Sequence, residues 1–204
     1  MSQLSLFSAE ARPPSPADLA GLLCGPGQVL RFGAGDQARL SIVLAEPTRA
    51  GAVIAACAAT GIMMHPVRTE NGSTALRSAF RCDLVDLAVA WTGGAVKSVP
   101  PGWQLDGAAL RLWAMAAGRP DDRGGYLLAL DPSAPQTHDA LIATATRAGI
   151  PPARVGHGPA LRISGARRVR RLVELVGPAP DRMASADWPR CWGRQASRPS
   201  AGSN

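Results

Sequence analysis

The sequence predicts an α+β fold made of two copies of one unit, ordered helix, strand, strand, helix, strand, strand, helix. Residues 52–62 (AVIAACAATGI) reappear as residues 140–150 (ALIATATRAGI), with five of eleven letters identical at an offset of 88. Two shorter pairs follow in the same order, 75–77 with 160–162 and 84–87 with 172–175. This period is too long for a solenoid repeat, and two copies of one half-domain usually pack about a pseudo-two-fold axis.

The first copy is expected over residues 17–92. It follows a flexible tail at residues 1–16, in which Pro13-Pro14-Ser15-Pro16 favours an extended tether because proline fixes φ and cannot continue a ladder. The first helix begins near Asp18, a suitable N-cap, and Gly25-Pro26-Gly27 ends it.

The rest of the first copy contains two strands, a helix, a hairpin and a closing helix. The strands are expected at 29–32 and 38–45, and from Arg39 to Leu44 polar and apolar residues alternate as they do in a half-buried sheet. The later elements are an Ala-rich helix at 46–60, a hairpin of strands 64–69 and 75–82 across Asn71-Gly72, and a helix at 83–91.

The second copy, expected over residues 106–178 after a connector at residues 93–105, repeats this order in a shorter form. Helices are expected at 106–118, 136–148 and 166–176, and strands at 126–130, 154–155 and 160–164. Residues 179–204 are rich in Arg, Ser, Pro and Gly, a composition that predicts a disordered tail.

The composition indicates a basic, cytoplasmic protein that contacts nucleic acid. The net charge is +7 and Lys97 is the only lysine, so 21 of the 22 cations are arginines, whose planar forks suit phosphate and guanine. The four cysteines are dispersed, which argues against a zinc site and a disulfide framework. No apolar run has the 18 or more residues of a membrane span. We expect a nucleoid-associated monomer without a cofactor and without a membrane partner.

The first helices of the two copies carry a family resemblance. Leu19-Ala20-Gly21-Leu22 matches the start of the LAGLIDADG signature, and residues 110–118 hold the equivalent place in the second copy. Residues 17–178 therefore resemble the single-chain, two-repeat form of the LAGLIDADG homing endonucleases. The resemblance implies that the signature helices pack on the pseudo-two-fold axis and that two antiparallel sheets form a saddle over DNA. Lys97-Ser98-Val99-Pro100-Pro101 is similar to the family connector.

The resemblance fails where the family holds its catalytic acids. Active members end each signature helix with an acid before the final glycine, and the matching positions here are Pro26 and Ala117, with Cys24 and Ala116 at the neighbouring aspartate positions. Oxygen ligands for divalent metals are missing there, so we expect a DNA-binding protein that is not an enzyme. Other acids fall in predicted turns, where solvated loop acids are the simpler interpretation: Asp36, Asp121 and Asp122.

Basic residues in the predicted sheets, hairpins and connector are the candidates for contact with double-stranded DNA. They are Arg31, Arg39, Arg68, Arg77, Arg81, Lys97, Arg123, Arg154 and Arg162. A slip of one residue in any strand would turn its side chains to the other face, and ordinary surface arginines are the alternative. Contacts to phosphate would be sensitive to salt and tolerant of DNA sequence.

The N-terminal pentapeptide is a second candidate site. Gln3, Leu4, Ser5, Leu6 and Phe7 match the bacterial sliding-clamp-binding motif at every position. Leu6 and Phe7 would enter an apolar cleft of the clamp while the Gln3 amide bonds to its rim. The alternative is an N-terminal segment that packs on the protein's own core.

Together these features predict an accessory protein of DNA replication or repair that docks on the sliding clamp and contacts duplex DNA. Two alternatives stay open. One is a divergent metal-dependent LAGLIDADG endonuclease that uses displaced acids such as Asp36 and Asp121. The other is a transcriptional regulator like the sporulation protein WhiA, whose LAGLIDADG-like part is not a nuclease.

Overall fold

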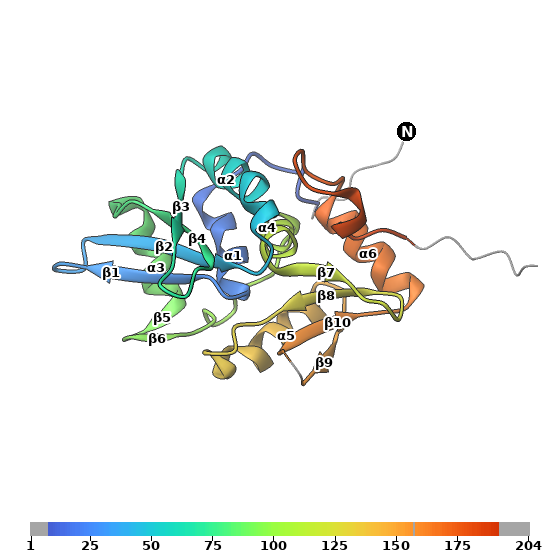
Figure 1. Ribbon diagram of the computed structural model, residues 1–204. Helices are drawn as coiled ribbons and strands as arrows, with labels where there is room; N and C mark the ends of the chain where they lie inside the picture. The colour runs from blue at the N-terminus through green and yellow to red at the C-terminus, as the bar shows by residue number, and fades with distance from the viewer. Residues whose placement is uncertain (1–7, 157, 192–204) are drawn as a thin grey trace, which may run out of the picture.

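A computed structural model describes residues 8–156 and 158–191 and contains two four-stranded antiparallel sheets with the same strand order (Figure 1). The first sheet has the order β1-β2-β4-β3, with β1 (Gln28–Phe32), β2 (Gln37–Leu44), β3 (Met64–Arg68) and β4 (Thr74–Ser78). The second has the order β7-β8-β10-β9, with β7 (Gly118–Pro120), β8 (Tyr126–Ala129), β9 (Ala153–Val155) and β10 (Ala160–Ile163). The predicted α+β fold with two equivalent repeats is confirmed.

Three helices of each repeat alternate with its strands along the chain and cover one face of its sheet. The first repeat contains α1 (Ala20–Cys24), α2 (Ala50–Ala59) and α3 (Val85–Trp91). The second contains α4 (Gly107–Ala117), α5 (His138–Arg147) and α6 (Ala166–Val176). The connector forms a two-stranded ribbon of β5 (Thr92–Gly93) and β6 (Val96–Lys97). No helix in the described ranges has the length and apolar character needed to cross a membrane.

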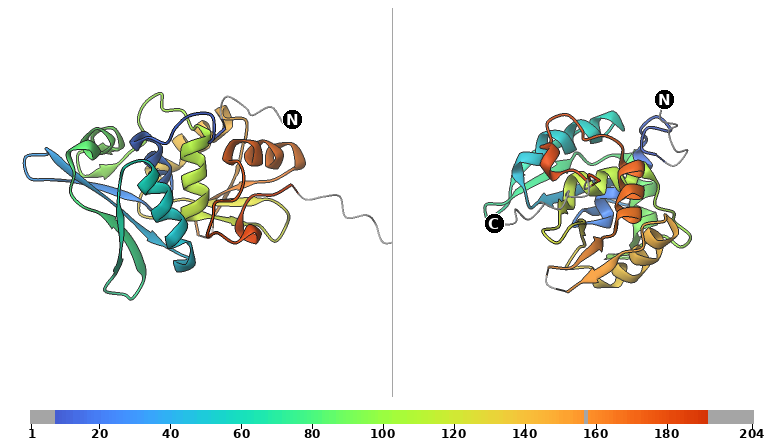
Figure 2. Two further views of the ribbon diagram at one scale, coloured as in Figure 1. Left: turned by 90° about the horizontal axis from the view of Figure 1, so that it is seen from above. Right: turned by 90° about the vertical axis from the view of Figure 1, so that its right-hand side faces the viewer.

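The helices α1 and α4 pack against each other at the centre of the molecule, and the two sheets extend to opposite sides of α4 (Figure 2). The contact is close because Gly21 has no side chain: a Cβ built there would lie 1.9 Å from the Ala109 carbonyl oxygen. The Asp106 carboxylate caps α4 by accepting a hydrogen bond from Ala109 N at 2.9 Å. Small residues at this interface thus set the spacing of the two repeats.

Both sheets have one buried face and one outer face. In β2 the alternating residues Leu40, Ile42 and Leu44 are buried, whereas Arg39 and Ser41 on the other side are partly exposed. In the second sheet Tyr126, Leu128, Leu161 and Ile163 lie on the buried face, and Leu127 and Ala160 in the register of the other face are buried as well. The period of two along each strand leaves one face of each sheet without covering helices, as the pattern in 38–45 predicted.

The segments before and after the two repeats differ from the predicted tails. Arg12 forms ion pairs with Asp18 at 2.5 Å and Asp106 at 2.6 Å. The chain before α1 therefore contacts the starts of both central helices, α1 and α4. After α6, Trp188 is buried and its indole N–H donates to Gly177 O at 2.8 Å. The expected flexible tail at residues 1–16 and disordered tail at residues 179–204 are therefore wrong for residues 8–16 and 179–191.

Candidate nucleic-acid interface

The outer face of the first sheet, defined here by Arg39, Ser41 and Arg77, is crossed by a polar row. Gln28 pairs with Ser41, Ser41 with Arg77, and Arg77 with His65, so one residue from each strand contributes. Arg77 and His65 are exposed, and no ion pair with a described residue is present at Arg77. The guanidinium of Arg77 is therefore available to an anionic ligand.

The outer face of the second sheet is defined by Arg119, Leu127 and Arg162, which are neighbours across β7, β8 and β10. Arg119 is exposed, and sequence reasoning did not include it because the short strand β7 was not predicted. Arg162 Nε lies 2.5 Å from Asp121 Oδ2, an ion pair in which the N–H is not aimed at the oxygen. Arg123 is exposed in the turn between β7 and β8.

Four of the predicted DNA-binding arginines lie on the other side of the sheets. Arg31 pairs with the buried Ala38, and Arg68 pairs with Thr74 in the register of the buried face. Arg81 also pairs with Ala38 and is held by Asp83 at 2.6 Å. Arg154 points toward α5.

The α5 contacts of Arg154 fix its direction. One guanidinium nitrogen lies 3.2 Å from His138 Nδ1, and another lies 3.5 Å from Asp139 Oδ1. Because direct partners in antiparallel strands share a face, these pairings separate Arg31, Arg68, Arg81 and Arg154 from the outer faces. The predicted DNA-binding residues therefore lie on two different surfaces, the outer faces of the sheets and their opposite sides.

The Lys97 side chain is only 11% exposed, and protein oxygens hold its ammonium group. Its ammonium donates to Gly25 O at 2.6 Å, to Gly27 O at 2.8 Å and to Asp131 Oδ2 at 3.0 Å. Burial lowers the pKa of Lys97, although the nearby Asp131 carboxylate opposes that shift. The predicted DNA contact is thus a structural cation that joins the end of α1 to the second repeat.

Arg49 holds the equivalent place at the end of α4. It comes from the turn between β2 and α2, is buried, and donates a short hydrogen bond to Gly118 O. Its guanidinium also lies 3.7 Å from Asp187 Oδ2. A cation therefore binds the end of each central helix. At the α1 end the turn after β8 supplies Asp131, the partner of Lys97, and at the α4 end the turn after β2 supplies Arg49 itself. No sequence pattern predicted this role for Arg49, because nothing marks an isolated arginine as buried.

The positions matched to the family acids lie side by side at these helix ends. A Cβ added at Gly25 would lie 3.1 Å from the Ala117 Cβ, so the α1 end with Pro26 adjoins the α4 end. Cys24 and Ala116 are fully enclosed, and burial raises the pKa of the Cys24 thiol. In the described ranges no cluster of three or more His, Cys, Asp or Glu is placed to hold a metal ion. The oxygens at the α1 end instead surround the Lys97 ammonium, so this arrangement does not fit a divalent ion.

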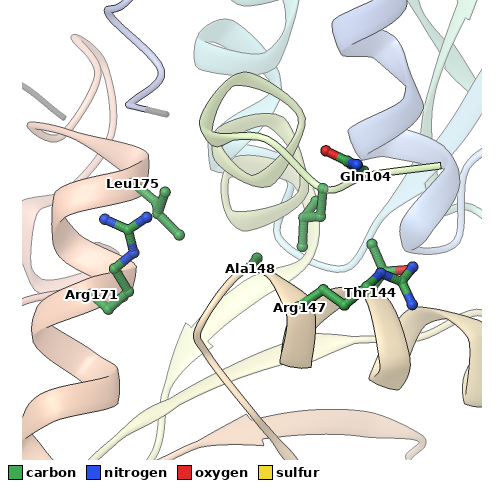
Figure 3. Close-up of a pocket in the computed structure, with 7 residues that line it drawn as sticks. Gln104, Thr144, Arg147, Ala148, Arg171 and Leu175 are labelled. Atoms are coloured by element: carbon green, nitrogen blue, oxygen red, sulfur yellow. The ribbon is translucent and has the colours of Figure 1, made fainter. Parts of the chain in front are cut away.

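A separate cavity of about 220 Å³ lies between α5 and α6, away from the outer faces (Figure 3). Arg147 and Arg171 both line it. Arg147 donates to Trp103 O at 3.3 Å and to Thr144 Oγ1 at 2.9 Å, and Arg171 lies 3.4 Å from Glu174. Both guanidinium groups thus already have partners within the protein. The cavity is therefore a weaker candidate for binding nucleic acid than the outer faces.

The two repeated sheets around paired central helices define the fold of a homing endonuclease. One solved structure that matches is the homing endonuclease I-WcaI bound to its DNA recognition sequence, with a TM-score of 0.58 and 12% identity, covering 86% of this chain and 83% of that one. No protein-family model and no curated protein sequence matches the chain. At this identity the likeness shows the fold.

The prediction that the chain is not an enzyme is wrong. The structure that shares its fold belongs to an endonuclease, and nothing in the described residues shows that catalytic acids are absent. The prediction rested on the lack of an acid at Pro26, Ala117, Cys24 and Ala116, and it assigned Asp36, Asp121 and Asp122 to solvated turns. Folding brings the Asp131 carboxylate from the second repeat to the end of α1, a juxtaposition that no helix-end motif records.

Proposed function

We propose that the protein binds double-stranded DNA across the outer faces of its two sheets. The observation that carries the proposal is that exposed arginines without an ion pair among the described residues occur on both faces, Arg77 on the first and Arg119 on the second. A net charge of +7 favours association with a polyanion, and the matching structure is a DNA complex.

The chemistry of these faces separates two kinds of contact. Arginine forks bind phosphate oxygens and position the protein, while side chains that reach base edges discriminate sequence. The row of Gln28, Ser41, Arg77 and His65 offers both donors and acceptors at one level of the sheet. Such a row is suited to the edges of bases in a major groove.

Duplex affinity tests this proposal directly. We expect Arg77→Ala and Arg119→Ala each to weaken binding of a labelled duplex and to reduce the magnitude of the log-affinity against log-salt slope by about 1 per lost phosphate contact. Arg168→Ala is the matched control, because Arg168 is exposed on α6 away from the outer faces. Equal losses in all three variants would refute a role for the sheets.

A tether to the bacterial sliding clamp is the second part of the proposed function. Gln3, Leu4, Ser5, Leu6 and Phe7 lie outside the described residues, so the support is the sequence match alone. Joining a clamp contact to a DNA contact would raise effective concentration at the replication fork. Binding to purified clamp should be lost in the triple variant Gln3→Ala, Leu6→Ala, Phe7→Ala, and unchanged affinity would exclude the tether.

Cleavage of the bound DNA is a second candidate function, favoured by the match to an endonuclease. Asp121 is the carboxylate to test, because it contacts Arg162 on an outer face. Nicking of plasmid DNA with added magnesium or manganese, reduced by Asp121→Asn but not by the exposed control Asp139→Asn, would support cleavage. Equal nicking by both variants and the wild-type protein would reject Asp121.

A further inference from the structure

The outer face of the first sheet carries an aromatic cluster that phosphate binding does not require. Phe32 is 60% exposed at the end of β1, and its ring centre lies 4.8 Å from that of Phe80 at an interplanar angle of 36°. The guanidinium carbon of Arg39 lies 4.6 Å from the centre of the Phe80 ring. Leu30, paired with Arg39, is 57% exposed beside them. Large exposed apolar side chains gathered in this way mark an interaction site.

A β-bulge creates the cluster. The strand pairing changes register between two pairs, Ser41 with Arg77 and Ala38 with Arg81. Residues 39–40 therefore oppose residues 78–80, one more than the ladder requires, and Ser78 Oγ accepts the Leu40 N–H at 3.0 Å. A bulge turns the following side chain to the other face. It places Phe80 beside Arg39 instead of in the core.

We propose that Phe32, supported by Phe80 and Arg39, stacks on an unpaired base, so that the protein prefers DNA containing unpaired nucleotides to a continuous duplex. This inference rests on the proposed binding of DNA. In a continuous duplex the bases are stacked on one another and present only their edges in the grooves, so an exposed phenyl ring has no base face to contact. An unpaired base offers that face to any aromatic ring.

The charges around the cluster favour a nucleotide over an apolar partner. Arg39 lies over the Phe80 ring and Arg77 follows on the next strand of the same face, so a base on Phe32 would have its phosphates near cations. The Phe80 ring, held between Arg39 and Phe32, fixes the orientation of Phe32 before binding. The bulge thus supplies a rigid aromatic surface with basic neighbours, which is the combination that binds single-stranded nucleic acid.

Fluorescence anisotropy with two DNAs of equal length tests the inference, one a continuous duplex and one with a three-nucleotide unpaired loop. Wild-type protein should prefer the looped DNA by roughly 5- to 100-fold, the equivalent of one stacked base. Phe32→Ser should remove the preference and retain duplex affinity. Val89→Ser is the matched control, because Val89 is 53% exposed on α3, which packs on the opposite face of the sheet. A 2-aminopurine in the loop should be quenched by wild-type protein and not by Phe32→Ser.

The outcomes distinguish this inference from the function on which it rests. Equal affinity for both DNAs, with binding intact, overturns the stacking role and leaves duplex binding in place. A preference that persists in Phe32→Ser also overturns it. Absence of binding to either DNA refutes the proposed function and the inference together. Concentration-dependent self-association that Phe32→Ser abolishes, without a DNA preference, would assign the cluster to a second copy of the chain and overturn stacking.

Discussion

Replacing Lys97 with methionine is predicted to destabilise the fold severely. The ammonium has three oxygen partners within 3.0 Å, and the Asp131 side chain is only 4% exposed. Lys97→Met would leave that carboxylate buried without a counterion and two helix-end carbonyls without a donor. Removing one partner of a buried pair costs about 3–5 kcal/mol. For a chain of this size each kcal/mol lowers the Tm by about 2–4 °C, so we expect a fall of roughly 6–20 °C.

A double variant separates the loss of the cation from the loss of packing. Lys97→Met with Asp131→Asn removes both charges, and the amide oxygen can still accept the hydrogen bond that Asp131 Oδ1 receives from Ser133 N at 2.9 Å. Because burial lowers the pKa of Lys97 despite its partner, the pair contributes little net stabilisation, and most of the lost stability should return. Urea denaturation measures each free energy of unfolding. A loss below about 1 kcal/mol in the single variant would refute the buried-cation account.

Other predictions concern packing and thiol chemistry. Gly21→Ala should force α1 and α4 apart and cost at least about 1–3 kcal/mol in thermal unfolding, whereas Gly93→Ala, with open space around it, should be close to neutral. Trp188→Ala should cost about 3–5 kcal/mol because its side chain is buried, and a change near zero would show that residues 179–191 do not pack. Burial raises the pKa of Cys57 to about 12 from 9.0. The stability contributed by its protonated thiol is therefore complete below pH 9 and is lost as pH rises toward 12. Cys57→Ala should flatten that decline.

The period of the sequence predicted most of the architecture. The internal repetition predicted two structural repeats. The alternation of polar and apolar residues in 38–45 predicted the buried and outer faces of β2 (Gln37–Leu44). The helix at 166–176 was predicted with its observed bounds, because apolar residues recur along it at helical spacing. Local pattern succeeds where each element carries its own signal.

Elements defined by tertiary contacts were not predictable in this way. β7 has three residues and contains Gly118 and Pro120, which argue against a strand unless a neighbour such as β8 is already known. Trp188 lies in a segment of tail-like composition, yet it is buried against the end of α6. Lys97 belongs to a recognisable connector, but its burial depends on Asp131, 34 residues away. Nor did the strand pattern reveal the bulge that reorients Phe80.

Cross-linking from single sites tests the central claim, that DNA lies on the outer faces of the sheets, most directly. A photoreactive label attached at Arg77→Cys on β4 and at Arg119→Cys on β7 should cross-link a bound duplex, while the same label at Arg168→Cys on α6 should not. Each protein would carry Cys82→Ser and Cys191→Ser, because those two thiols are exposed. Efficient cross-linking from α6 with none from the sheets would contradict the account.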